Sequence, residues 1–288
     1  ILYLIPPDIS ERFLSALGRI GYPSGSVLRY IEDNPANPQR AIGTSVDPNA
    51  FGGMLAMVGA LATLQLVARK PLLGRRWMAW LVFALIVVTL VLTLSRAAIT
   101  SLAVTILAVA WLRYPRLVWI VVFGIAIIFL LPDASQGYGI HFLEGIQGRD
   151  LATQMRFGEY KDAFILLERY PLIGVGFGTA PDADIYLGVS NAYLTIAEEM
   201  GFVGLAVFLL VIGVLFWWAY VHRQESDHES SLVVTWWGIH AGLASILVVG
   251  MFDHYFVNLE FHPAQIMFWL FVGLALSATR LMSASQSN

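Results

Sequence analysis

The sequence predicts an all-α membrane protein: a polytopic bundle of transmembrane helices with a large periplasmic loop that contains an amphipathic helix. The first observation is composition, since 58% of the residues are hydrophobic, 13% are charged and the mean hydropathy is +0.70. Soluble domains are about half apolar and a quarter charged. The second observation is that apolar stretches recur along nearly the whole chain. We therefore expect a single membrane domain over residues 1–288.

The start of the chain is apolar at residues 1–5 but has no initiator Met, no basic region and no small-residue cleavage site. A secretory signal peptide combines a basic region with a cleavage site. We therefore interpret these residues as the end of a span and expect the chain to be truncated at its N-terminus.

Seven segments have the length and apolarity of membrane spans, which need about 20 apolar residues or slightly fewer. The stretch 77–112 is too long for one crossing, and Ser95 and Arg96 would then lie within lipid, where a charge is costly. We therefore divide it into a tight hairpin that places Arg96 at a membrane face. The predicted spans are 49–68, 77–94, 97–112, 117–131, 201–220, 232–252 and 264–280.

Basic residues in the short connections predict the orientation, because cytoplasmic loops are enriched in Lys and Arg. Four basic segments fall on one side when the seven crossings are numbered in order. We expect that side to be cytoplasmic and the opposite side to face the periplasm. The basic segments are 68–76, 113–116, 222–223 and Arg280, and the outward segments are 6–47, 95–96, 132–200 and 253–263.

The outward segment 132–200 is a long extracytoplasmic loop, and loops of this length usually have a function. Residues 155–170 show the spacing of an amphipathic helix, which we expect on the bundle or in the membrane interface. Pro171 should end this helix, because the residue before a proline avoids the α region. The predicted apolar stripe consists of Phe157, Tyr160, Phe164 and Leu167.

A glycine-rich strip follows at residues 174–178. It is not a dinucleotide-binding fingerprint, because the later glycine is missing and no strand–helix unit surrounds it. Glycine lets a ligand or another helix approach the backbone closely. Gly174 and Gly176 are therefore candidate substrate-binding residues.

Composition also argues against several classes of partner and cofactor. The net charge of −3 and the lack of a basic run predict no nucleic-acid partner. Without cysteine there is no disulfide, thiolate catalysis or cysteine metal site. The six histidines do not have the spacing of a metal site. We expect no metal and no cofactor.

Arginines on the predicted outer side are the main candidates for ligand binding. Arginine presents a planar fork of donors that binds phosphate in a bidentate way. Their excess on a side that positive charge normally avoids predicts an anionic phosphate ligand, and the alternative is that each one pairs with an outward carboxylate. Arg96 is the strongest candidate, because it lies in a turn between two lipid-length helices. The set is Arg12, Arg19, Arg29, Arg40, Arg96, Arg149, Arg156 and Arg169.

Two pairs of residues are candidates for proton transfer. Glu198 and Glu199 begin the predicted span after the long loop, where the helix dipole favours acidic residues. That is sufficient to explain Glu198, whereas Glu199 can also take a proton from an acceptor hydroxyl. Asp253 and His254 are adjacent in an outward turn and can form a base that a carboxylate orients.

Two stretches share the order of motifs of a known family. Residues 156–179 read RFGEYKDAFILLERYPLIGVGFGT, and residues 190–205 read SNAYLTIAEEMGFVGL. They resemble the O-antigen ligase and polymerase family of bacterial membrane glycosyltransferases, in which an Arg precedes an amphipathic helix, a proline–glycine turn, an Asn-x-Tyr-Leu and a Glu-x-Gly. Residues 94–97 resemble the family's Ser-Arg hairpin, and residues 40–49 resemble its entry into an earlier span.

The resemblance implies a larger helix bundle, of which this chain holds the C-terminal portion. It implies metal-independent transfer of a glycan from undecaprenyl diphosphate to an acceptor glycan or lipid A core, at the periplasmic face of the bacterial inner membrane. The partners are then these two glycans and membrane lipids, in the synthesis of cell-surface polysaccharide. The implied catalytic residues are Arg96, Arg156 and Glu199, and the implied substrate-binding residues are Arg40, Arg149, Asn191, Tyr193, Gly174 and Gly176.

One residue departs from the family pattern. Ser190 stands where the family usually has a His that activates or positions the acceptor, and serine is not a base near pH 7. Glu199, His254 or His141 then takes this role, or the acceptor differs, or transferase activity is lost. The departure favours the polymerase over the ligase.

Two other functions stay open. Some relatives of the family resemble inorganic-carbon carriers, so a membrane transporter is the alternative. A transporter should place ionisable or helix-breaking residues inside its spans, whereas here His240 and scattered glycines are nearly all that the spans contain. A scaffold in an envelope complex would tolerate substitution of Arg96 and Arg156.

Overall fold

The computed structural model describes residues 7–16, 27–31, 34–43, 45–130, 147–148, 151–177, 188–223 and 230–287. Within them the chain is mostly helical, with one short antiparallel strand pair. The elements are α1 (Pro7–Ala16), β1 (Arg29–Tyr30), β2 (Gln39–Arg40), α2 (Pro48–Gln65), α3 (Arg76–Leu92), α4 (Arg96–Leu112), the 3₁₀ turn η4 (Pro115–Leu117), α5 (Val118–Leu130), α7 (Leu151–Arg169), α8 (Ala192–Val221), α9 (Ser231–Val249) and α10 (His262–Ser287).

Three of the described helices are long and apolar enough to cross a membrane: Ala192–Val221, Ser231–Val249 and His262–Ala284. Three shorter apolar helices cover Arg76–Leu92, Arg96–Leu112 and Pro115–Ala126. Each predicted span overlaps one of these helices or, for 49–68, the helix α2, and the three long apolar helices indicate an integral membrane protein. The number of seven crossings stays a prediction. The main difference lies in α8, which begins at Ala192 instead of residue 201.

Local chemistry explains where several of these helices begin. The Asp47 side chain accepts hydrogen bonds from the backbone N–H groups of Asn49 and Ala50, and Pro48 occupies the first turn of α2. A short acceptor at the N-cap followed by proline is a strong helix start. The side chains of Ser95 and Ser230 accept hydrogen bonds from backbone N–H groups at the starts of α4 and α9.

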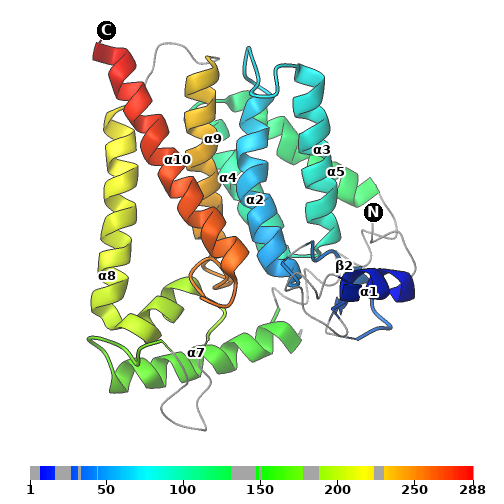
Figure 1. The fold of residues 1–288 in the computed structure, drawn as a ribbon, viewed down its shortest axis with the longest axis vertical. Helices are drawn as coiled ribbons and strands as arrows, with labels where there is room; N and C mark the ends of the chain where they lie inside the picture. Colours follow the sequence, from blue (N-terminus) through cyan, green and yellow to red (C-terminus); the bar gives the residue numbers. More distant parts are fainter. Residues whose placement is uncertain are drawn as a thin grey trace.

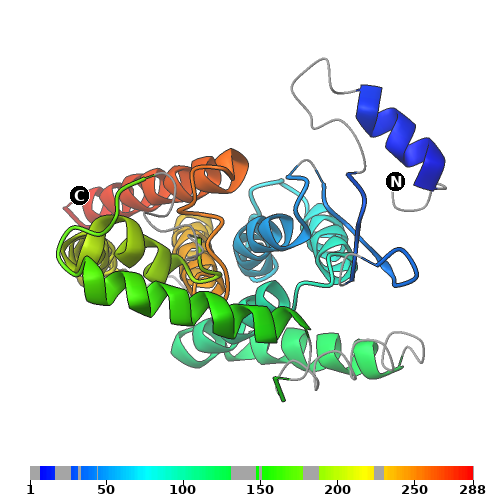
Figure 2. The same ribbon diagram turned by 90° about the horizontal axis from the view of Figure 1, so that it is seen from below.

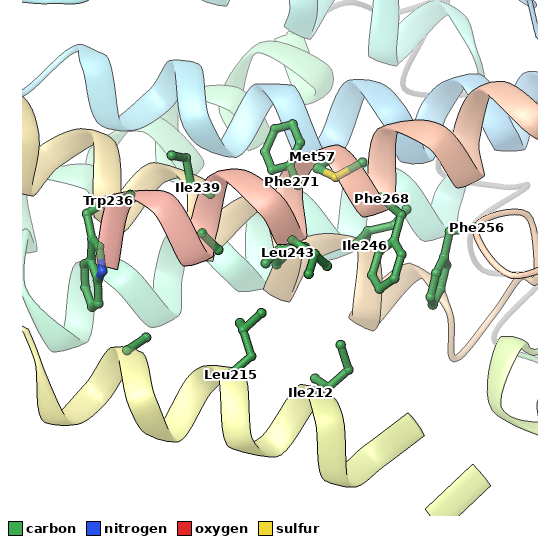
Figure 3. Packing of buried hydrophobic residues seen from close by; sticks show 14 of the residues in the cluster. Met57, Ile212, Leu215, Trp236, Ile239, Leu243, Ile246, Phe256, Phe268 and Phe271 are labelled. Carbon is green, nitrogen blue, oxygen red and sulfur yellow. The ribbon is translucent and has the colours of Figure 1, made fainter. Parts of the chain in front are cut away.

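The α9 helix forms the centre of the bundle. In the spanning window of α9, 67% of the residues are buried, compared with 22% in α8. Gly238 and Gly242 let α9 approach α2, since a Cβ atom at these positions would lie 2.7 Å from the Leu61 side chain and 2.8 Å from the Met57 carbonyl oxygen. Large side chains from α8, α9 and α10 fill the opposite side, including Leu215, Leu243 and Phe268 (Figure 3).

The helices alternate in direction, so their connections gather at two ends of the bundle (Figure 1). The lower end in Figure 1 contains β2, the start of α2, the α3–α4 turn, the start of α8 and the loop 250–261 between α9 and α10. The α7 helix lies across this lower end, roughly perpendicular to the spans (Figures 1 and 2). The upper end contains residues 66–75 and 113–117 and the end of α10.

The predicted amphipathic helix is present as α7, and it ends at Arg169 before Pro171. Its buried face differs from the predicted stripe. Ala163, Leu166 and Leu167 are buried, whereas Phe157 and Phe164 are 62% and 56% exposed. Of the predicted stripe only Leu167 is buried, because α7 turns its other face toward α8.

The α8 helix has a break at Gly201, where φ is 68° and ψ is −176°. The turn that follows α7 docks into this break. The Phe202 N–H donates to the Pro171 carbonyl oxygen at 2.8 Å, and a Cβ atom at Gly201 would lie 2.2 Å from the Leu172 backbone. The position therefore requires glycine for its dihedral angles and for the contact with the neighbouring backbone.

Candidate functional site

The α3–α4 turn consists of Thr93, Leu94 and Ser95, so the predicted hairpin is confirmed. Leu94 has a positive φ of 56°, which is costly for a residue with a side chain. Ser95 accepts from the Ala98 N–H, and Arg96 is the first residue of α4 and is half-buried. The strained turn thus places Arg96 at the lower end of the bundle.

Arg40 joins this turn to the start of α2. Its Nε donates to the Thr93 carbonyl oxygen at 2.8 Å, and its Nη2 donates to Asn49 Oδ1 at 2.5 Å. The neighbouring Ala41 N–H donates to the Leu92 carbonyl oxygen at 2.8 Å. Arg40 therefore holds two helix ends together, and its guanidinium lies partly buried beside them.

A tyrosine from the α9–α10 loop connects to the same helix start. The Tyr255 hydroxyl hydrogen-bonds to the side chains of Asp47 and Asn49. Burial raises the pKa of Tyr255 well above its ordinary value, and the nearby carboxylates add to this effect. Val46, directly before the Asp47 cap, has a positive φ of 64°. A second strained residue thus lies at this end of the bundle.

Asp253, in the same loop, is a buried carboxyl group that is 3% exposed. Burial raises the pKa of Asp253 to about 8, the charge of Asp47 adds to the shift, and Arg156 opposes it. Arg156 lies one helical turn before Glu159 on α7, so both residues share a face. Glu159 in turn accepts a hydrogen bond from the Ser190 N–H at 2.9 Å. The predicted Arg156 therefore lies within the electrostatic reach of Asp253.

His254 contacts the segment that leads into α8. Its Nδ1 lies 2.8 Å from the Val189 carbonyl oxygen, and its backbone N–H donates to Asp253 Oδ1 at 3.0 Å. The prediction that Asp253 orients the imidazole ring is therefore wrong, because the carboxylate binds the His254 backbone. A carbonyl from a distant segment orients the ring instead.

Asn191 and Tyr193 hold the start of α8 in place. Asn191 Oδ1 accepts from the N–H groups of Tyr193 and Leu194, which makes it the N-cap, and its Nδ2 donates to the Met251 carbonyl oxygen. The Tyr193 hydroxyl donates to the Leu247 carbonyl oxygen at 2.7 Å. These contacts give both residues a structural role, and their predicted contact with substrate stays a prediction.

Gly174 and Gly176 pack against the backbone of α8. The N–H groups of Val175 and Gly176 donate to the carbonyl oxygens of Glu198 and Glu199 at 2.7 and 2.9 Å. A Cβ atom at Gly174 would lie 2.4 Å from the Glu198 carbonyl oxygen. The predicted close approach of the glycine backbone to another helix is thus confirmed, and that helix is α8. Contact with a ligand stays a prediction.

The acidic pair lies just before the break in α8. Glu198 is buried and lies beyond the first turn of α8, so the helix dipole does not explain it as predicted. Neither of its carboxylate oxygens has a hydrogen bond of normal geometry, although the backbone of Gly188 and Val189 approaches them. Glu199 is half-buried. The two neighbouring carboxylates therefore differ in their access to solvent.

Arg149, His141 and Arg19 lie outside the described residues. Among the residues that are described, no three His, Asp or Glu side chains come close enough to hold a metal ion. His240 is buried in α9, where its Nδ1 bonds to the Trp236 carbonyl oxygen as expected for a packed helix residue. The candidate site thus consists of residues at the lower end of the bundle.

Comparison with known proteins supports the resemblance. Residues 81–209 match the O-antigen ligase family. The match includes the α3–α4 turn, α7 and the start of α8, and hence Arg96, Arg156 and Glu199. It confirms the predicted resemblance to O-antigen ligases and polymerases and implies a membrane glycosyltransferase activity of that type. No curated protein matches the chain.

Part of the site lies outside the segment that matches the O-antigen ligase family. Arg40 and Asp47 precede the match, and residues 253–255 follow it. Sequence reasoning missed Tyr255 and the contact between Glu159 and Ser190. The available signal was the polar run from Asp253 to Tyr255 between two apolar helices.

Proposed function

We propose that the protein is a membrane glycosyltransferase that moves a glycan from undecaprenyl diphosphate to a sugar acceptor, as an O-antigen ligase or polymerase. The carrying observation is that Arg40, Arg96 and Arg156, which are distant in sequence, belong to elements that meet at one end of the bundle. The family match to residues 81–209 supports the reaction class. The reaction belongs to the synthesis of cell-surface polysaccharide such as lipopolysaccharide.

The arginines suit a diphosphate leaving group. As the bond between the sugar and phosphate breaks, negative charge builds on the diphosphate, and positioned guanidinium groups stabilise it. Arg96 also lies at the N-terminus of α4, where the helix dipole favours anions. Arg40 and Arg156 approach from β2 and α7. In this proposal the three residues hold the donor diphosphate without a metal.

The acceptor binds near the start of α8 in this proposal. Asn191 and Tyr193 shape this region through their bonds to the loop after α9. The break in α8 lies beside Glu199, Gly174 and Gly176. Arg149 belongs in sequence to the same outward loop, 132–200. We propose that these four residues lie at the edge of the acceptor-binding site.

The orientation follows from the basic residues. The exposed Arg69, Lys70, Arg75 and Arg76 lie at the upper end of the bundle, opposite the candidate site. Because cytoplasmic loops are rich in Lys and Arg, we place the upper end in the cytoplasm and the site at the periplasmic face of the bacterial inner membrane. Undecaprenyl diphosphate glycans are then reached from the outer leaflet.

The test is glycan transfer by the purified intact protein, with undecaprenyl-diphosphate-linked oligosaccharide and a lipid A core acceptor. Wild type should lengthen the glycan or move it to the acceptor, and the size of the product separates polymerase from ligase. Arg156→Ala should lower transfer by about 100-fold or more, since loss of one charge-stabilising donor costs this much in other enzymes.

Lys161→Ala is the matched control, because Lys161 is an exposed cation on the same helix. It should keep wild-type transfer. If wild type neither binds the lipid-linked donor nor transfers the glycan, the proposed function is overturned and vesicle transport assays test the transporter alternative.

A further inference from the structure

The α9–α10 loop lies beyond the segment that matches the O-antigen ligase family, yet it adds Asp253, His254 and Tyr255 to the candidate site. Asp253 is buried, and the Tyr255 hydroxyl hydrogen-bonds to Asp47 and Asn49 at the start of α2. His254 is half-buried, and its Nε2 lies 3.4 Å from the Asn258 amide nitrogen.

The contacts of the ring determine which nitrogen carries the hydrogen. Nδ1 lies 2.8 Å from the Val189 carbonyl oxygen, which can only accept, so Nδ1 is the donor. In the neutral ring Nε2 then has a lone pair and is an acceptor. The Asn258 amide nitrogen lies 3.4 Å from Nε2, so the hydrogen bond that it donates to Nε2 is weak. This tautomer is the one that a general base requires.

The contacts of His254 also involve residues near the proposed site. Val189 directly precedes Ser190, whose N–H binds Glu159 on α7, one turn from Arg156. On the other side, the His254 N–H binds Asp253, whose carboxyl group interacts with Arg156. His254 is thus bonded to a residue that Arg156 influences electrostatically, and its ring contacts the residue before Ser190, which binds the helix of Arg156.

We propose that His254 is the general base of glycan transfer and acts through Nε2, a role that rests on the proposed function. Nε2 takes the proton of the acceptor hydroxyl, and the freed electron pair on that oxygen forms the bond to the anomeric carbon of the donor sugar. The bond from this carbon to the phosphate oxygen breaks, and its electron pair leaves with undecaprenyl diphosphate. The imidazolium then passes its proton to solvent.

A purely structural role for His254 makes a different prediction. The Val189 carbonyl oxygen also accepts from the Asn191 N–H at 2.6 Å and from Thr195 Oγ1 at 3.0 Å. His254 would then only be one more donor to a carbonyl that already has two. His254→Asn separates these roles, because its amide nitrogen takes the place of Nδ1 while no atom replaces Nε2.

The experiment compares transfer, donor binding and thermal stability for wild type, His254→Asn and the exposed control His262→Asn from the start of α10. His254→Asn should lower the transfer rate by about 100-fold or more, as for loss of a general base, and should leave donor binding and stability unchanged. His262→Asn should match wild type. A second variant, Ser190→His in the His254→Asn background, returns an imidazole to the adjoining position and should recover part of the rate.

Full transfer activity in His254→Asn would overturn this inference while leaving the proposed function intact. Loss of transfer in Glu199→Gln together with full activity in His254→Asn would assign the base to Glu199 instead. No transfer by wild type would overturn the proposed function itself, so the two failures are distinguishable.

Discussion

Arg40 at the lower end of the bundle and Arg75 at the upper end lie in different surroundings. At the lower end Arg40 is bonded to two helix ends, and the side chains of Asp47, Ser95 and Asn191 cap three helices. At the upper end Arg75 stands at the start of α3 without a side-chain cap bond and is exposed. Arg40 is thus part of the packing at the lower end, whereas Arg75 is exposed at the start of α3.

This difference indicates which arginines of a membrane protein have a structural role. The orientation of a membrane protein depends on the sign of the charges in its cytoplasmic loops. An arginine whose nitrogens bond to a carbonyl and an amide on separate elements is held in one geometry, and its substitution affects several elements at once. Substitutions at equivalent positions of the two ends test this contrast.

The largest expected effect is on the backbone contact at the α8 break. Gly201→Ala places a Cβ atom 2.2 Å from the Leu172 backbone at a φ of 68°, so it should prevent folding or destabilise by more than about 3 kcal/mol. Gly74→Ala at the upper end also has a positive φ of 74° but meets nothing within 4 Å. It should cost only about 1 kcal/mol. Thermal unfolding in detergent measures both, and equal losses would contradict the contrast.

The next effect depends on pH. The pKa of Asp253 is raised from 3.8 to about 8, so its protonated form stabilises the fold. This stability is fully present below pH 3.8 and is lost as pH rises through the window up to about 8. The loss is at most about 1.4 kcal/mol for each pH unit.

Asp253→Asn keeps the shape and removes the titration, so its stability should fall less between pH 5 and 8 than that of wild type. Thermal unfolding at several pH values tests this expectation, with the exposed Glu260→Gln from the same loop as the control. Parallel curves for wild type and Asp253→Asn would show that Asp253 is already ionised across this range.

The smallest expected effect concerns the arginine that joins two helix ends. Arg40→Ala removes bonds to the Thr93 carbonyl oxygen and to Asn49 and should cost about 2 kcal/mol. Arg40→Lys should recover little, because an ammonium group cannot reproduce the fork that reaches both partners. Arg75→Ala at the upper end should change stability by less than about 0.5 kcal/mol. Similar values for the two alanine variants would remove the contrast between the ends.

Much of the helix pattern was predictable from local sequence. Apolar runs of membrane length are unambiguous because lipid offers the backbone no hydrogen-bond partners. The Asp47–Pro48 start of α2, the Ser95–Arg96 hairpin and the end of α7 before Pro171 were likewise predictable, since each depends on a residue and its immediate neighbours. The arginine candidates Arg40, Arg96 and Arg156 could also be named, because charge on the outer side is unusual.

The sequence by itself thus determined the apolar helices, the helix before Pro171 and the family that residues 81–209 resemble. Only the tertiary structure decided that α8 starts at Ala192 and breaks at Gly201, because the break depends on the Pro171–Leu172 backbone that docks there. It also decided that a carbonyl, and not Asp253, orients His254, since 65 residues separate His254 from Val189. Such contacts form when helices pack, so local sequence patterns do not contain them.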